Sequence, residues 1–262
     1  MAHLLYEKTG HIATVTMNRP EARNAWSLEL MARMADAWAD IDADPDIRVA
    51  VFTGAGGTFS AGADLKLMHA DQRDNPWHAR FKEDPDLHWR AMLRSYSLKK
   101  PLVAAVEGYA LGGGTEILQC TDIRVAAHDA TFGLTESAWG LFPLGGSTVR
   151  LQRQIPRVHA MDMLLTGRRV SAQEALSWGL VNRLVEPGTA LEEAMKVAEI
   201  IAGNGPIAVQ AIKRAILEAA DLSEADGLAN ELAVGQPVFK SQDAREGPRA
   251  FAERRKPNFT GE

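Results

Sequence analysis

The sequence predicts an α/β protein, and three observations lead to this prediction. The apolar segment 49–53 runs into a glycine-rich corner and then toward a helix. The apolar segment 102–106 does the same, and helical periodicity dominates the chain after residue 147. Because the order of strand, corner and helix recurs, we expect ligand-binding loops along one edge of a sheet.

Local patterns predict the individual elements of the first half of the chain. Ser27 is a suitable N-cap for the helix that follows it. Residues 69–86 are polar, carry two prolines and show no steady period, so we expect a mobile loop there. The expected strands are residues 11–17, 47–53, 102–106 and 122–126, and the expected helices are residues 28–41, 87–98 and 113–119.

The second half is predicted to be mostly helical. Ser171 and Glu174 form a capping box that opens a short helix, and Gly179 ends it. Further helices are expected over residues 190–202, 206–219 and 223–234. We therefore divide the chain into an α/β core, residues 1–200, and a C-terminal helical region, residues 201–262.

Composition places the chain among ordinary globular proteins. It has 262 residues, of which 46% are hydrophobic and 24% charged, enough to bury a substantial core. The formal net charge of −5 gives no general attraction to nucleic acids or to an anionic membrane. A polyanionic ligand would therefore need local basic groups.

The remaining global features favour a reducing, cytoplasmic setting. Cys120 is the single cysteine, so no intrachain disulfide can form, and its apolar surroundings predict a small buried hydrophobe. The N-terminal residues lack a basic segment followed by an apolar core, and no apolar run approaches the roughly 20 residues that a membrane helix needs. We expect a cytoplasmic protein without membrane contact.

Two glycine-rich corners and two carboxylates carry the predicted chemistry. Residues 59–66 and 107–116 place bare backbone amides at the openings of helices, where N–H groups lack partners and can bind a developing negative oxygen. Glu116 follows the second corner, and Glu136 lies on a later turn. Taken alone, Glu116 could be a first-turn helix acid and Glu136 a solvated turn residue. Together, the four features indicate a site that handles an enolate.

These segments closely resemble the crotonase superfamily, also called the enoyl-CoA hydratase/isomerase family. The strongest matches are SAGADLK at residues 60–66 and GYALGGG at residues 108–114. Weaker matches cover NRPEARN at 18–24, LTGRRVSAQEA at 165–175 and REGPRAFAERR at 245–255. The resemblance implies a spiral of ββα units with a C-terminal helical region that assembles trimers or dimers of trimers.

The resemblance also assigns chemical roles. An enoyl-CoA hydratase adds water across the 2,3 double bond of an acyl thioester, and the backbone amides of Ala63 and Gly113 would hold the thioester oxygen. Glu116 would chiefly activate the water, and Glu136 would chiefly protonate the α-carbon. Because both carboxyl groups can share one water, the division between them stays open. Coenzyme A belongs to the substrate, and neither another cofactor nor a metal is expected.

Several further residues are expected to contact the substrate. By resemblance, the acyl-CoA-binding stretch matches Ala61 and residues 63–66, and the Leu144 amide stands where relatives help to hold the water. The residues that extend the predicted contacts are Asp64, Leu65, Lys66, Arg23 and Arg254. Ordinary explanations compete, because Asp64 can cap a helix and Lys66 and Arg254 can be solvated charges. Bulky residues fit either a large acyl group or core packing, namely Trp77, Phe81, Trp89, Trp139 and Phe142.

Three other functions compete with hydration. The segment 243–254 also resembles carnitinyl-CoA dehydratases. Double-bond isomerisation needs only one acid, so the presence of both Glu116 and Glu136 disfavours it. A non-catalytic RNA-binding role has support only from short basic patches at residues 150–153, 167–169 and 253–256, which lack interleaved aromatic residues.

Overall fold

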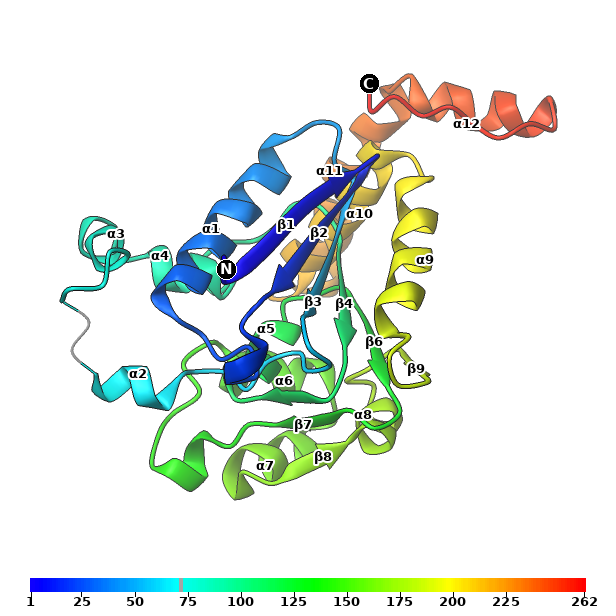
Figure 1. Cartoon of the computed structure of the whole chain (residues 1–262). Helices are drawn as coiled ribbons and strands as arrows, with labels where there is room; N and C mark the ends of the chain where they lie inside the picture. Colours follow the sequence, from blue (N-terminus) through cyan, green and yellow to red (C-terminus); the bar gives the residue numbers. More distant parts are fainter. Residues whose placement is uncertain (71–72) are drawn as a thin grey trace.

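The computed structural model describes residues 1–70 and 73–262 and contains two sheets with helices around them (Figure 1). The main sheet has the strand order β1-β2-β3-β4-β6-β9; β1 is antiparallel to β2 and the other pairs are parallel. Its strands are β1 (Leu4–Thr9), β2 (Ile12–Met17), β3 (Val49–Gly54), β4 (Leu102–Val106), β6 (Ile123–Ala127) and β9 (Arg183–Val185). The predicted α/β class is confirmed.

Helices cover both faces of the main sheet, which explains why its central strands β3 and β4 are almost entirely apolar. On one face, Phe52 and Leu102 pack into a large core with α1 (Leu28–Ala43). On the other, Val51 and Val103 pack against α9 (Ala190–Ala202) (Figure 1). Alternate residues of β3 and β4 therefore serve different cores.

A second, smaller sheet turns away from the main one and carries the site. It has the order β5-β7-β8, with strands β5 (Tyr109–Leu111), β7 (Thr131–Gly133) and β8 (Arg169–Ser171). The chain enters it directly from the main sheet, because β5 follows β4 and β7 follows β6 along the sequence. Each strand pair ends near a helical segment: α5 (Gly113–Leu118) follows β5, and the 3₁₀ helix η2 (Glu136–Trp139) follows β7. This repeat agrees with the expected spiral of ββα units.

The other helices complete the layers around these sheets. Beside the site lie the short helices α2 (Leu65–His69), α3 (His78–Glu83) and α4 (Leu87–Ala91). Of the helices that follow η2, α8 (Ala172–Trp178) packs against β7 and β8, α7 (Arg157–Thr166) packs against η2, and α6 (Ser147–Gln154) packs against α7. Within the described residues, no helix combines the length and apolar character needed to cross a membrane.

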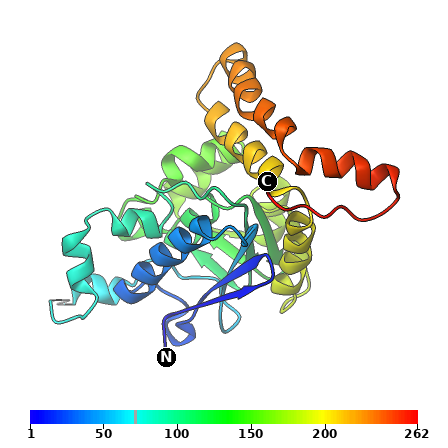
Figure 2. The ribbon, with the colours of Figure 1, turned by 90° about the horizontal axis from the view of Figure 1, so that it is seen from above.

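Of the C-terminal helical region, α10 (Pro206–Ala219) lies against the rest of the fold, where Lys213 donates hydrogen bonds to the Lys100 carbonyl and to Asp122, whereas the helices after it project outward (Figure 2). The helices of this region are α10, α11 (Glu224–Gly235), the 3₁₀ helix η3 (Gln236–Lys240) and α12 (Asp243–Ala252). Several large apolar side chains on them are more than half exposed, namely Ile212, Ile216, Leu228, Leu232, Phe239 and Phe251. The predicted helical C-terminal region is confirmed, whereas its role in oligomerisation stays a prediction.

Some of the local predictions from the sequence are confirmed and others are wrong. Ser27 caps α1 as predicted, because its side chain accepts a hydrogen bond from the Leu30 amide. The expected helix over residues 87–98 is wrong beyond Ala91, because Leu93 adopts a left-handed conformation with φ of 53° that no α-helix accommodates. The expected loop over residues 69–86 contains α3, and its residues 71–72 lie outside the described part.

We expect Phe52→Ala to lower the free energy of unfolding by about 3–5 kcal/mol, because the ring fills a fully buried site. The ring centroids of Trp38 and Phe59 lie 5.3 and 5.2 Å from that of Phe52, both edge-to-face. Urea unfolding measures the loss. Phe251→Ala is the control, since Phe251 is 87% exposed; equal losses in the two variants would contradict this description of the core.

Candidate active site

Two glycine corners meet at the junction of the sheets. Gly62 has φ of 81° and Gly112 has φ of 52°, conformations that glycine adopts without strain. A Cβ atom added to Gly62 would lie 2.7 Å from the Gly113 nitrogen and 2.5 Å from the Leu111 carbonyl oxygen. The corners therefore approach so closely that only glycine fits at position 62.

Glu116 lies in the first turn of α5. Its backbone N–H donates a hydrogen bond to the carbonyl oxygen of Gly112, the N-cap residue four positions earlier. Its side chain is buried, and burial raises the pKa of this carboxyl above its ordinary value. Hydrogen bonds from the backbone amides of Gly145 and Ser147 oppose that rise, since they favour the charged form. The Ser147 amide lies 3.4 Å from Oε1. Glu116 is thus a buried acid that the opposite loop partly stabilises as a carboxylate.

Glu136 opens η2 and approaches the glycine corner from the other side. Its Oε1 would lie 3.2 Å from a Cβ atom added to Gly112. Its Oε2 is buried and has no hydrogen-bond partner within the part of the chain that the structure describes. Burial, with a smaller contribution from the Glu116 charge, raises the pKa of Glu136 to about 7. Near neutral pH, Glu136 therefore carries its proton for much of the time, unlike an ordinary glutamate.

A cavity of about 620 Å³ joins these groups. Ala63, Gly113, Glu116 and Glu136 all line it. Most of the remaining wall is apolar and comes from α1, α2, α4 and the loop after η2; it includes Leu28, Met31, Leu67, Met68, Trp89, Met92, Leu141, Phe142 and Leu144. Two carboxyl groups and two amide corners thus share one largely apolar space.

The structure brings only some of the other expected contact residues to this cavity. Asp64 lines it, but its carboxylate also accepts hydrogen bonds from the Lys66 and Leu67 amides and pairs with Arg19 at 3.2 Å. Leu144 lines the cavity and is 55% exposed. Asp64 is therefore at least a helix cap and ion-pair partner.

The remaining expected contacts lie outside the cavity wall. Ala61, Leu65 and Lys66 are close in sequence to the cavity residues Ala63 and Asp64, and the side chains of Leu65 and Lys66 are exposed. The Arg23 guanidinium stacks over the Tyr109 ring at 5.6 Å, and Arg254 follows α12, which projects away from the sheets (Figure 1). Contacts of these five residues with coenzyme A stay predictions.

The aromatic residues singled out from the sequence divide into two groups. Trp89 and Phe142 line the cavity, whereas Trp77, Phe81 and Trp139 do not. Trp77 instead lies under the Arg33 guanidinium at 5.1 Å, and Trp139 is 68% exposed.

Sequence reasoning missed two notable residues of the wall, Trp26 and His88. Trp26 packs its ring against the second corner, since Cζ3 would lie 2.9 Å from a Cβ atom on Gly113. Its position directly after residues 18–24, which resemble a family motif, was an available signal. His88 offered none, because its place on the wall depends on where α4 ends and how α4 packs.

Amide donors beside two buried carboxyl groups define an enzyme that stabilises a negative oxygen while moving protons at neighbouring carbons. Comparison with known proteins agrees with this class. The family model for enoyl-CoA hydratase/isomerase matches residues 7–262. The chain therefore belongs to the enoyl-CoA hydratase/isomerase family.

Individual relatives are similar over almost their whole length. The enoyl-CoA hydratase EchA19 of Mycobacterium tuberculosis is 52% identical, with 97% of this chain and 95% of the relative covered. A carnitinyl-CoA dehydratase of Salmonella arizonae is 37% identical, with 97% of each chain covered. The crystal structure of an enoyl-CoA hydratase from Mycobacterium tuberculosis H37Rv has a TM-score of 0.90 and 41% identity, with 100% of both chains covered.

We expect one glutamate carboxyl to titrate near pH 7, because burial favours the neutral form of Glu136. Its proton is bound below that pH and lost above it. Carbon NMR of protein labelled at the glutamate carboxyl measures this titration, which Glu136→Gln should remove. Glu186→Gln, at an exposed position, should keep it. Titration of every carboxyl near its ordinary value would contradict the proposed environment of Glu136.

Proposed function

We propose that the protein is an enoyl-CoA hydratase, a hydro-lyase that reversibly adds water to the 2,3 double bond of a 2-enoyl-CoA thioester. The observation that carries the proposal is the shared cavity of Ala63, Gly113, Glu116 and Glu136. Hydration of a conjugated thioester needs both amide donors and carboxyl groups, because the reaction develops charge on the carbonyl oxygen and moves two protons. The product is a 3-hydroxyacyl-CoA.

The amides of Ala63 and Gly113 would bind the thioester oxygen. As the water oxygen bonds to C3, the π electrons of the double bond move toward the thioester and form an enolate. Backbone N–H groups that are already in place stabilise this charge without reorganising, and each such donor typically contributes about 3 kcal/mol. The close approach of Gly62 to Gly113 supports this arrangement, since it holds both corners at one point.

The different surroundings of the two carboxyl groups support a division of proton transfers. Glu116 receives backbone hydrogen bonds that favour its carboxylate, so it would take the proton from water. Glu136 Oε2 has no partner among residues 1–70 and 73–262, and the pKa of Glu136 is about 7, so Glu136 would give its proton to C2 of the enolate. After this step Glu116 is protonated and Glu136 ionised, and exchange with solvent restores the starting state. No cofactor other than the coenzyme A of the substrate takes part.

The cavity wall favours a large apolar acyl group. Its long side chains come from α1, α4 and the loop after η2, and they include Met31, Met92 and Phe142. An extended or ring-bearing acyl group would remove more apolar surface from water there than a short one would.

Lys66, Arg23 and Arg254 would bind the coenzyme A phosphates, and Arg254 would do so from a neighbouring subunit.

A second candidate is the dehydration of carnitinyl-CoA, because the chain is similar to a carnitinyl-CoA dehydratase. Trp26, Trp89 and Phe142 line the cavity and are the aromatic groups that would contact a trimethylammonium group. Turnover of a 4-trimethylammonio acyl thioester would distinguish this function from general hydration. Isomerisation is less well supported, since it leaves one of the two buried carboxyl groups without a role.

Assembly and location complete the proposal. The exposed apolar side chains of α10, α11 and η3 favour contact with further copies of the chain, as a homotrimer or a dimer of trimers. This assembly agrees with the expectation from family resemblance. We also propose a cytoplasmic location, which the single cysteine favours.

We expect Glu116→Gln and Glu136→Gln each to lower kcat/KM for hydration by about 10²–10⁴-fold, because each removes one proton-transferring group. Mass spectrometry of enoyl-CoA thioesters in ¹⁸O-labelled water measures labelled 3-hydroxyacyl-CoA directly. Glu186→Gln serves as the control. Full activity in either cavity variant would remove that residue from the mechanism. Deuterium exchange at the α-carbon in D₂O, without incorporation of oxygen from ¹⁸O-labelled water, would instead indicate isomerase chemistry.

We also expect kcat/KM to fall on both sides of an optimum below neutral pH. Above about pH 7 Glu136 loses the proton that it must donate, so activity should fall about tenfold per pH unit. On the acid side, protonation of Glu116 removes the base, at a pH above the ordinary glutamate value. The residual activity of Glu136→Gln should lack the alkaline limb. An unchanged alkaline limb in that variant would assign the titration to another group.

A further inference from the structure

The wall that α4 contributes to the cavity contains one polar side chain. Pro85, His88, Trp89 and Met92 line the cavity; His88 and Trp89 lie within α4, Pro85 precedes the helix and Met92 is its C-cap residue. Three of them are apolar or largely so. His88 therefore introduces an imidazole into a surface that otherwise suits hydrocarbon.

The other polar side chains of the wall have evident roles. Glu116 and Glu136 belong to the proposed chemistry. Asp64 is bonded to Arg19 and to two amides of α2. The Ser27 hydroxyl accepts from the Leu30 amide and lies 2.7 Å from His3 Nδ1. The Trp26 indole nitrogen is enclosed by protein, and the Trp26 ring packs against Gly113.

His88 differs from all of these. Within residues 1–70 and 73–262 its ring makes no hydrogen bond, and its nitrogens are not among the enclosed polar atoms. The ring packs edge-on to Trp89, with 4.7 Å between centroids. Burial lowers the pKa of His88, so the imidazole is neutral at neutral pH and offers one donor and one acceptor. When a bound acyl group displaces water from the cavity, an imidazole nitrogen keeps a hydrogen bond only if the ligand supplies a polar atom.

We propose that His88 recognises an oxygen function on the acyl group, a ketone or a hydroxyl, remote from the 2,3 double bond. The inference rests on the proposed hydratase function and specifies its substrate class: large, mainly apolar 2-enoyl-CoA thioesters that carry such an oxygen. A carboxylate suits the site less well, because the imidazole is neutral and two glutamates share the cavity. His88 is a specificity residue and takes no part in the proton transfers.

The test compares 2-decenoyl-CoA with mono-oxo derivatives whose ketone stands at successive carbons from the sixth outward. We expect the wild-type protein to prefer at least one oxo derivative by about tenfold in kcat/KM, mostly through a lower KM. His88→Phe keeps a flat ring but removes both nitrogens, and it should bring that ratio to about one. His88→Gln restores a donor and an acceptor and should recover part of the preference.

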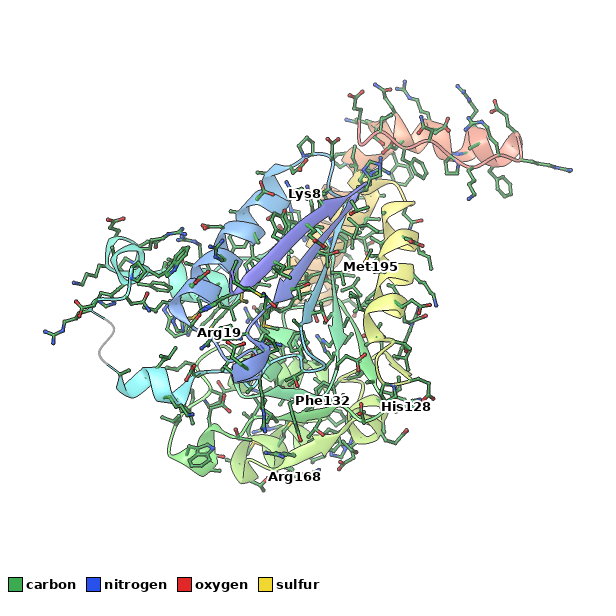
Figure 3. All side chains as sticks on the ribbon, viewed as in Figure 1. Lys8, Arg19, His128, Phe132, Arg168 and Met195 are labelled. Carbon is green, nitrogen blue, oxygen red and sulfur yellow. The ribbon has the colours of Figure 1, made fainter. Side chains whose placement is uncertain are left out.

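His128→Phe is the matched control, because His128 is exposed and lies on the side of the molecule away from α4 (Figure 3). In this variant the ratio of kcat/KM for the preferred oxo derivative to that for 2-decenoyl-CoA should equal the wild-type ratio. Equal kcat/KM values for all thioesters in the wild type, or a preference that persists in His88→Phe, would overturn the role of His88 while leaving hydration intact. Failure of the wild-type protein to hydrate any of the thioesters would overturn the proposed function and this inference with it.

Discussion

The close approach of two backbone corners is the constraint on which the site depends. A side chain at Gly62 would collide with the Gly113 nitrogen, so the corners can meet only if that position is glycine. Pairing between Ser60 and Ala110 holds the same two segments together. Since α5 begins at the second corner, this meeting also determines where Glu116 lies. The spiral of strand pairs is thus a means of bringing distant amides and an acid to one point.

The cavity then gives two chemically identical side chains different properties. Both glutamates are removed from water, which raises the pKa of each. The loop after η2 supplies amides that offset part of this rise at Glu116, whereas Glu136 Oε2 has no hydrogen-bond partner among the described residues, so Glu116 is the better placed of the two to act as a carboxylate and Glu136 as a carboxylic acid. The hydrogen bonds of a single loop can therefore separate a base from an acid within one apolar space.

The sequence predicted the fold class, the strand Leu102–Val106 and the helices α9 and α10 with their observed bounds, because these segments combine clear periodicity with clear caps. The short motifs at residues 60–66 and 108–114 also drew attention to the glycine corners and, by family resemblance, to both glutamates, which the structure brings to one cavity. Prediction from the sequence failed where tertiary packing decides: the left-handed Leu93 ends α4 early, and no periodicity announces that His88 faces the cavity. Strands as short as β8 and β9 are likewise set by pairing across the chain more than by propensity.

The central claim is that the Ala63 and Gly113 amides polarise a thioester carbonyl. Isotope-edited infrared spectroscopy of a 2-enoyl-CoA labelled with carbon-13 at C1, bound to Glu116→Gln so that hydration is slow, tests it directly. We predict that the carbonyl stretch moves to a lower frequency than in water, because two fixed donors draw charge onto the oxygen. A stretch at or above its frequency in water would contradict the account.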